Sequence, residues 1–318
     1  MRRPPQVASA RDQGDGVWRM MVSNGGSLLR VLIWQWRYGV TYASLGAAAW
    51  LLHDVAGWTH FHIPVAPASI VGAALGIFAS FRVNAAYARW WEGRQLWGKL
   101  VNSSRMLCSQ TLAYVLDPGV REAAVRRQVL YIHVLRCQLR DDDPFADAMV
   151  LRSLESGGLN ADQQVDMKRQ TSLCHSLLDQ TLRELAAVAV EPMRLQSIDQ
   201  TLAAILDAQG GCERIKRTPM PRGYAFFVSQ LLVLFAMLFP LAVVPNLGWA
   251  VIPVNLAVCL AFTLISETGR VLEDPFNHFW NSLPITSIAV TIERNLRQRL
   301  GDSELPPATT VDADGILW

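Results

Sequence analysis

Residues 63–105 read IPVAPASIVGAALGIFASFRVNAAYARWWEGRQLWGKLVNSSR, and this stretch decides the fold. Its first part, Ile63 to Phe81, contains no Asp, Glu, Lys or Arg. An apolar segment of about 18 or more residues is long enough to cross the hydrocarbon core of a bilayer as a helix. Arg82 then opens a block that is dense in polar and aromatic residues. We therefore expect a membrane-spanning helix that leads into helical structure outside the membrane.

The rest of the chain shows the same uneven distribution of charge. Charged residues make up 18% of the 318 residues, yet none occurs over 38–53, 55–81 or 223–266. The third gap is long enough for two spans, and the turn-forming sequence at 245–248 divides it. The pattern predicts four membrane-spanning segments, near 38–57, 63–81, 224–244 and 250–267. It excludes an ordinary cytosolic globular protein and a disordered chain, and the net charge of +2 argues against a nucleic-acid partner.

The basic residues predict the orientation in the membrane. Segment 1–37 carries six Arg and two Asp, whereas the linkers within the two pairs of spans carry no Lys or Arg. Basic segments stay on the cytoplasmic side, so both termini are expected there. We predict a multi-pass protein of the inner membrane in five parts: a cytoplasmic N-terminal segment 1–37, spans within 38–81, a cytoplasmic domain 82–222, spans within 223–267, and a cytoplasmic C-terminal segment 268–318.

The middle region, 82–222, has the pattern of an all-α domain. It holds 35 of the 56 charged residues, and helix-forming residues dominate its runs. Turn-forming residues separate those runs, including the glycine pairs at 157–158 and 210–211. The predicted helices lie near 83–116, 119–139, 144–155, 161–189 and 192–209. The tail after Leu300 looks irregular.

Signatures of catalysis are missing from the sequence, including the P-loop, nucleophile-elbow and zinc-protease motifs. His53, His60 and His62 lie near the outer ends of the first two spans, where a metal or haem is conceivable, but interfacial polar residues are the simpler interpretation. The Asp141–Asp143 run similarly favours a solvated turn that caps a helix beginning at Pro144. We therefore expect a protein that is not an enzyme, with no catalytic residue, no metal and no cofactor.

The second span is unusual for its small residues. If Ile70 faces a central axis, helical spacing puts Ala66 and Ala74 on the same face, with Ile77 or Phe78 beyond them. A ring of such faces would form a narrow hydrophobic constriction of the kind that gates by dewetting. A small-residue helix packed within a bundle remains the alternative.

The block after this span carries a specific pattern. It consists of Arg82, Asn84, Tyr87, Arg89, Trp90, Trp91, Glu92, Arg94 and Trp97. It resembles the signature of the bestrophin family, in particular of its bacterial branch. Two later stretches, at 212–224 and 273–294, are also similar to bestrophin segments, so the resemblance extends over about 25–300. The resemblance implies that the block is a structural signature and does not conduct ions.

The resemblance also implies a homopentamer around a central pore, embedded in the lipid bilayer. Its hydrophobic neck would fall on Ala66, Ile70 and Ala74. Bestrophins usually have bulky apolar side chains there, so the two alanines would widen the neck or leave Ile70 as its tightest ring. A register shifted by one residue would bring in Leu75 or Phe78.

Below the neck, the resemblance implies a wide vestibule that ends in an apolar lower aperture. Met193 is the best match for this aperture and Leu195 the next, because both follow the Glu191–Pro192 sequence. Animal members carry an acidic calcium clasp, whereas the corresponding segment here, 277–282, has no carboxylate. Calcium activation of that type is therefore not expected.

The expected function is an ion channel that passes small monovalent ions, with chloride or another anion favoured. A monovalent cation channel of the same fold is one alternative, because span two carries no charge that would select by sign. A membrane scaffold that binds a cytoplasmic partner is another, and a haem or metal enzyme at the three histidines is the least favoured.

Overall fold

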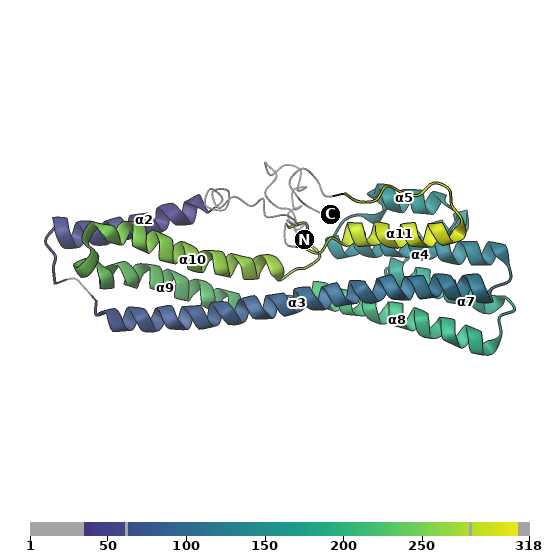
Figure 1. Ribbon diagram of the computed structural model, residues 1–318, viewed down its shortest axis with the longest axis horizontal. Helices are drawn as coiled ribbons and strands as arrows, with labels where there is room; N and C mark the ends of the chain where they lie inside the picture. The colour runs from purple at the N-terminus through teal and green to yellow at the C-terminus, as the bar shows by residue number, and fades with distance from the viewer. Residues whose placement is uncertain (1–34, 61–62, 280–281, 311–318) are drawn as a thin grey trace.

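The computed structural model describes residues 35–60, 63–279 and 282–310, and these residues form helices and connecting turns with no strand. The all-α class predicted from the sequence is therefore confirmed. The molecule is elongated, and one long helix runs along most of its length (Figure 1). The α-helices are α2 (Trp36–Trp50), α3 (Val65–Tyr114), α4 (Pro118–Arg140), α5 (Ala148–Glu155), α6 (Ala161–Arg169), α7 (Leu173–Ala187), α8 (Pro192–Arg217), α9 (Arg222–Leu247), α10 (Val251–Leu272) and α11 (Ile285–Leu300).

One end of the molecule is a bundle of α2, α9, α10 and the first part of α3 (Figure 1). A π-helical turn, η1 (Leu51–Val55), extends α2, and a short 3₁₀ turn, η3 (Gly248–Ala250), joins α9 to α10. Two helical stretches, Val65–Tyr114 and Ala225–Leu272, are long and apolar enough to cross a membrane. Only 22% and 39% of their most apolar windows are buried within the chain, which is unlike the core helix of a soluble protein.

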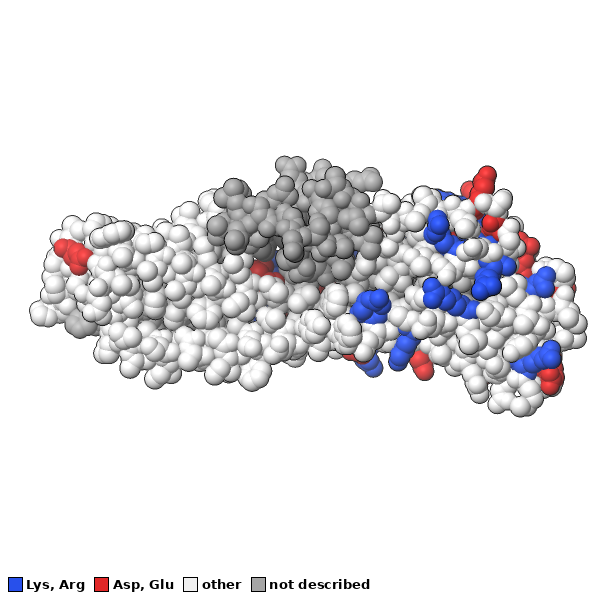
Figure 2. Space-filling model, in the orientation of Figure 1, with Lys and Arg blue, Asp and Glu red and all other residues white. Residues whose placement is uncertain are grey.

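The other end packs the rest of α3 with α4, α5, α7, α8 and α11 (Figure 1). Its core includes Trp97, Leu130, Ile205 and Ile292, each fully buried. On the face that Figure 2 shows, Lys, Arg, Asp and Glu gather on this end, whereas the α2–α9–α10 end is nearly free of them. The charge gaps of the sequence therefore correspond to one physical half of the molecule.

Local sequence signals explain most of the helix boundaries in the charged half. Asp117 accepts hydrogen bonds from the backbone N–H groups of Gly119 and Val120, and Pro118 occupies the first turn of α4. Asn160 and Gln163 form a capping box at the start of α6. These caps satisfy backbone donors that the helix itself leaves unpaired.

Several predicted boundaries were wrong. The predicted 63–81 and 83–116 segments form one helix, α3, because nothing between Phe81 and Arg82 interrupts the backbone. The predicted 161–189 helix is two, α6 and α7, since the polar residues 170–172 leave the helical conformation between them. The glycines at 210–211 lie inside α8, because Gly211 packs directly on Leu96.

Two further differences concern the later part of the chain. Residues 245–247 belong to α9, and the turn comes at Gly248, whose φ is +53°. Helix α11 was not among the predicted helices. The described tail, 301–310, has no regular structure, as expected.

Candidate functional site

The first five turns of α3 have one face that the chain itself leaves uncovered. Ala66 is exposed, and Ile70, Ile77 and Phe81 on the same face are 69%, 57% and 57% exposed. Their spacing of four, seven and four residues aligns them in a stripe along the helix. This exposed apolar face of α3, defined by these four residues, carries no charge.

The opposite side of the same segment packs inside the bundle. Leu75 and Ala79 are buried with Phe235 and Cys259, which come from α9 and α10. Gly72 lies close to Phe235, since a Cβ there would stand 2.8 Å from its ring. The segment thus has one face fixed by the chain's own helices and one free.

The three predicted neck residues do not all lie on the free face. Ala66 and Ile70 are exposed, whereas Ala74 is half-buried and its neighbour Ala73 is exposed. The predicted neck therefore stays a prediction, with its register on α3 favouring Ala66 and Ile70, and Ala73 was not anticipated. Spacing by four along a helix of 3.6 residues per turn drifts toward the packed side, which explains the difference at Ala74.

Arg82 marks the end of the apolar part of α3, and it turns inward. The side chain is buried, and its Nη1 donates to the Ser266 Oγ at 3.0 Å. Its Nη2 lies 4.0 Å from an Oε of Glu273. Arg82 therefore links α3 to the end of α10 and leaves the exposed face of α3 uncharged.

Arg89 joins three separate segments through their backbone. Its guanidinium donates to the carbonyl oxygens of Ile215, Thr218 and Glu273 at 2.6, 2.8 and 3.1 Å. Two of these carbonyls lie at the C-terminal end of α8 and the third follows α10. Cations near helix C-termini are favourable because the carbonyls there have no helical partner. One turn on, Glu92 accepts from Arg214 of α8.

The Glu273–Phe276 segment makes further contacts between the apolar half and the charged half. Glu273 accepts from the backbone N–H of Met220 at 3.2 Å, and Asp274 accepts from the Lys216 Nζ at 3.0 Å. Asp141 also pairs with Lys216, at 2.8 Å. Burial lowers the pKa of Lys216, but the hydrogen bonds that its ammonium donates to Asp141 and Asp274 outweigh this effect, and the net shift of the pKa is upward.

Some of the remaining motif side chains are packed in the core of the charged half, and others are exposed. Trp97 is fully buried in the core of the charged half, and Gly93 lets Phe276 approach, with a Cβ there only 3.2 Å from its ring. Trp90 packs against the same core and stacks with Tyr87. Four motif side chains are exposed: Asn84, Tyr87, Trp91 and Arg94.

The two predicted aperture residues occupy the first turn of α8. Met193 is 70% exposed, whereas Leu195 packs against the core of the charged half. Gln110 donates to the Ser197 Oγ at 2.9 Å and so ties this turn to the last part of α3. Both residues lie near the end of α3 that is farthest from Ile70. The exposed side chain of Met193 suits an aperture better than the packed side chain of Leu195. Both assignments stay predictions.

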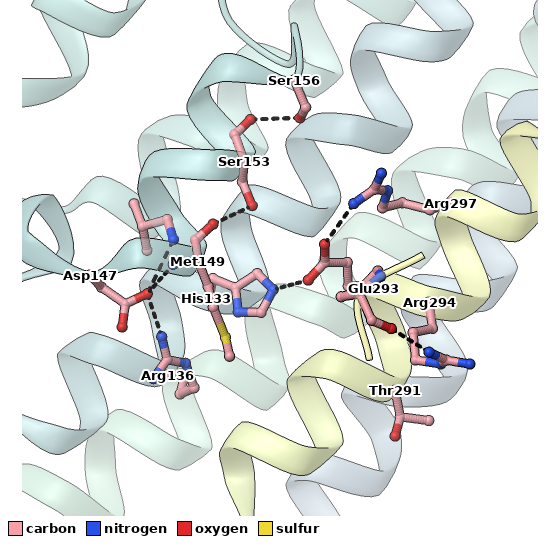
Figure 3. Close-up of polar contacts among 12 residues, drawn as sticks. His133, Arg136, Asp147, Met149, Ser153, Ser156, Thr291, Glu293, Arg294 and Arg297 are labelled. Carbon is pink, nitrogen blue, oxygen red and sulfur yellow. Dashed lines mark hydrogen bonds and ion pairs between the residues drawn. The ribbon is translucent and has the colours of Figure 1, made fainter. Parts of the chain in front are cut away.

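A buried ionic network between α4 and α11 was not predicted from the sequence. His133 Nε2 lies 2.8 Å from a Glu293 carboxylate oxygen, and Arg297 donates to the same carboxylate at 3.2 Å (Figure 3). Nearby, Arg136 pairs with Asp147 at 2.7 Å (Figure 3). Burial raises the pKa of Glu293, but the hydrogen bond with His133 and the charge of Arg297 outweigh it and lower the pKa overall. The partners stand 160 residues apart in sequence, so no local pattern signals them.

Several of the residues considered for metal binding have other partners. His53 hydrogen-bonds Asp54 at 2.6 Å, and His62 lies outside the described residues. Asp142 pairs with His278 at 3.4 Å, and Asp143 accepts from the backbone N–H of Phe145. Within 35–60, 63–279 and 282–310 the structure contains no cluster of three His, Cys, Asp or Glu side chains suited to a metal ion.

The chain thus has an apolar helical half, a charged helical half, and contacts of Arg82, Arg89 and residues 273–276 that connect the two. This arrangement defines an all-α membrane protein. The model of the bacterial and fungal bestrophin proteins matches residues 8–298. The chain therefore belongs to the bestrophin family, as its sequence motif indicated.

Individual relatives match most of this chain. A voltage-dependent anion channel-forming protein from Mesorhizobium japonicum is 32% identical over 249 residues, which are 76% of this chain and 77% of that protein. The protein of the same description from Escherichia coli strain K12 is 32% identical over 78% of this chain and 82% of its own length. A crystal structure of a bacterial bestrophin homologue from Klebsiella pneumoniae has a TM-score of 0.75 and 27% identity, and covers 84% of this chain and 98% of that one.

Proposed function

We propose that this protein is a pentameric channel for small anions such as chloride. The single observation that carries the proposal is the exposed apolar face of α3, an uncharged stripe on a helix long enough to cross a bilayer. Five such faces around an axis would enclose a narrow hydrophobic passage that conducts when wetted.

The proposed topology has four crossings per subunit. These are α2 with η1, the first part of α3, α9, and α10. The charged half and both termini lie in the cytoplasm, and the membrane is the inner membrane. The charge partition of Figure 2 and the basic residues that flank the apolar segments support this orientation.

The preference for anions rests on the relatives, several of which are described as voltage-dependent anion channel-forming proteins. Because the neck itself is uncharged, selectivity by sign must come from groups outside it. The cytoplasmic region carries 19 basic and 16 acidic residues, a slight excess of positive charge.

The decisive experiment measures the reversal potential of the purified protein in planar bilayers under a KCl gradient. A reversal potential near the chloride equilibrium potential is the expected result. A value near the potassium equilibrium potential would make the protein a cation channel of the same fold. The absence of any ion flux from reconstituted liposomes would instead favour a membrane scaffold.

A further inference from the structure

A polar cavity in the charged half has no role in the proposed ion pathway. It lies between α3 and α11 and has a volume of ≈ 480 Å³. Its polar lining consists of Arg105 and Ser109 from α3, and Asn295, Gln298 and Arg299 from α11. Cys108 and Leu296, both buried, form its apolar wall. Ligand cavities commonly measure about 300–1,000 Å³, so this one is large enough for a small organic molecule.

The charge of this cavity is one-sided. Its lining includes two guanidinium groups and no carboxylate. Neither Arg105 nor Arg299 forms an ion pair with any residue that the structure describes. By contrast, the adjacent Arg297 and the α4 residue Arg126 both pair with Asp302, at 2.7 and 3.1 Å. Two cations thus share a cavity in which nothing neutralises them.

The polar neighbours supply hydrogen-bonding groups beside these cations. The amide N–H of Asn295 donates to the backbone carbonyl of Thr291, which leaves its Oδ1 and one N–H for another partner. Gln298 and Arg299 are exposed, as are Arg105 and Ser109, so the cavity is open to solutes. Hydroxyl and amide groups next to guanidinium groups suit a ligand that combines an anionic end with polar atoms.

A second cavity of the described chain provides a contrast. It measures ≈ 590 Å³, lies between α6 and α7, and its charged lining includes Asp162, Asp166, Asp179 and Arg183. The carboxylates there repel anions, and Arg183 is paired with Asp179 at 2.9 Å. The α3–α11 cavity therefore differs from the α6–α7 cavity less in size than in charge, because its two guanidinium groups have no carboxylate beside them.

We propose that the cavity between α3 and α11 binds a soluble organic phosphate. A guanidinium presents a planar fork that matches phosphate oxygens in two parallel hydrogen bonds, and charge-assisted bonds of this type are stronger than neutral ones. Arg105 and Arg299 hold the phosphate, while Ser109, Asn295 and Gln298 contact the organic part.

The position of the cavity selects a soluble ligand over a lipid headgroup. Arg105 follows Arg82 by 23 residues on one continuous helix. At a rise of about 1.5 Å per residue, it lies about 35 Å beyond the end of the apolar part of α3. That distance exceeds the depth of the headgroup region, so a membrane phosphate does not reach the site.

The test is isothermal titration calorimetry of the full chain in detergent with AMP, adenosine and inorganic phosphate. AMP is expected to bind saturably, adenosine not at all, and inorganic phosphate about tenfold or more weakly than AMP, because it lacks the organic contacts. The double variant Arg105→Gln/Arg299→Gln is expected to lose at least about tenfold in AMP affinity. The matched control Arg183→Gln, in the acidic cavity, should bind AMP as the wild type does.

Both arginines are exposed, so the double variant is expected to fold normally. Equal AMP affinity in the wild type and the double variant would overturn the proposal, as would no saturable binding of AMP. Equal affinity for AMP and inorganic phosphate would reject an organic ligand. Tighter binding of a phosphatidic acid than of AMP in the same calorimetric titration would reject a soluble ligand. In the wild type, AMP affinity should also fall as salt concentration rises.

Discussion

At the scale of single residues, the family motif works through arginines whose roles differ. Arg89 satisfies three backbone carbonyls that would otherwise lack partners, whereas Arg94, one and a half turns later, is exposed and forms no ion pair with a described residue. Arginine therefore stabilises the fold through hydrogen bonds at position 89, whereas the described residues offer no such partner at position 94. The sequence pattern alone treats the two positions alike.

Arg89→Gln is therefore expected to destabilise the protein while Arg94→Gln is not. Loss of charge-assisted hydrogen bonds to these carbonyls, of which two are part-buried and one is exposed, costs up to about 1.5–3 kcal/mol each when nothing replaces them. Partial replacement by water and by the Gln amide gives a net loss of about 2–4 kcal/mol. Thermal unfolding in detergent measures the difference. A melting temperature that falls equally in both variants would contradict this role of Arg89.

The His133–Glu293 pair predicts a dependence of stability on acid pH. The pKa of Glu293 is lowered in the folded state from an ordinary value of 4.5. A carboxyl with a depressed folded pKa stabilises the fold above its unfolded pKa, and this contribution is lost as pH falls through the folded pKa. Stability should therefore decline below about pH 4.5. The pKa values of Asp147 and Asp302 are lowered as well and add to this decline.

Glu293→Gln isolates the contribution of this one carboxylate. The variant is expected to be less stable than the wild type at pH 7 and to lose less stability on acidification, because a neutral amide does not titrate. Unfolding temperatures measured from pH 3 to 7 give the two slopes. Parallel slopes in variant and wild type would show that Glu293 does not contribute.

Ile70 offers the residue-scale test of the proposed neck. Ile70→Ala removes bulk from the most exposed apolar side chain of the face and should raise the single-channel conductance, because a wider constriction wets more readily. Val71→Ala is the matched control, since Val71 packs inside the subunit against the membrane-half cluster. Equal currents in wild type and Ile70→Ala would exclude Ile70 from the neck.

At the scale of elements, close helix packing in the membrane half depends on small residues. Gly46 of α2 touches the backbone of α10, since a Cβ there would stand 3.0 Å from the Ile252 Cα. A Cβ at Gly39, on the same helix, would stand 3.6 Å from the Leu256 side chain, which is an ordinary van der Waals contact. Small residues let helix backbones approach closely in a bilayer.

Gly46→Ala is accordingly expected to destabilise the protein by about 1–3 kcal/mol, because the backbone of α10 cannot yield as a flexible side chain would. Gly39→Ala should be neutral or stabilising, given that Ala favours helix over Gly by about 1 kcal/mol. The melting temperatures of the two variants in one detergent provide the comparison. A lower value for Gly39→Ala than for Gly46→Ala would refute the packing argument.

The elements also show how far the sequence determines the fold. Hydropathy predicted apolar segments where α2, the first part of α3, α9 and α10 lie, because lipid and water favour opposite compositions over long stretches. Their four crossings of a membrane stay a prediction. The composition changes from apolar to polar at Arg82, and this change predicts the end of a helix. The backbone of α3 nevertheless continues as a helix through Arg82. The glycines at 210–211 predicted a break in α8, but Gly211 is there to admit Leu96 from α3. Such tertiary reasons are invisible in a local window.

The candidate site was predictable to a similar degree. The motif follows from residue type and spacing, and helical spacing groups Ala66 with Ile70 on one face. Their role in a neck stays a prediction. The tilt of Ala74 toward the packed side does not follow from sequence, since it depends on how α9 and α10 lie against α3. The pairing of His133 with Glu293 and the cavity at Arg105 and Arg299 join residues far apart in the chain, and only the folded structure brings them together.

At the scale of the whole molecule, the free face of α3 needs a partner, and five subunits are the predicted arrangement. A single chain does not enclose an aqueous path, whereas identical subunits close into a ring by cyclic symmetry. Native mass spectrometry of the solubilised protein should give five times the chain mass of 35.3 kDa. Ile70→Ala should keep the pentameric stoichiometry, because the residue is expected to face the axis and not a neighbouring subunit. Cross-linking that saturates at the dimer would reject the ring, and with it the neck, because two copies of the face cannot surround a pore.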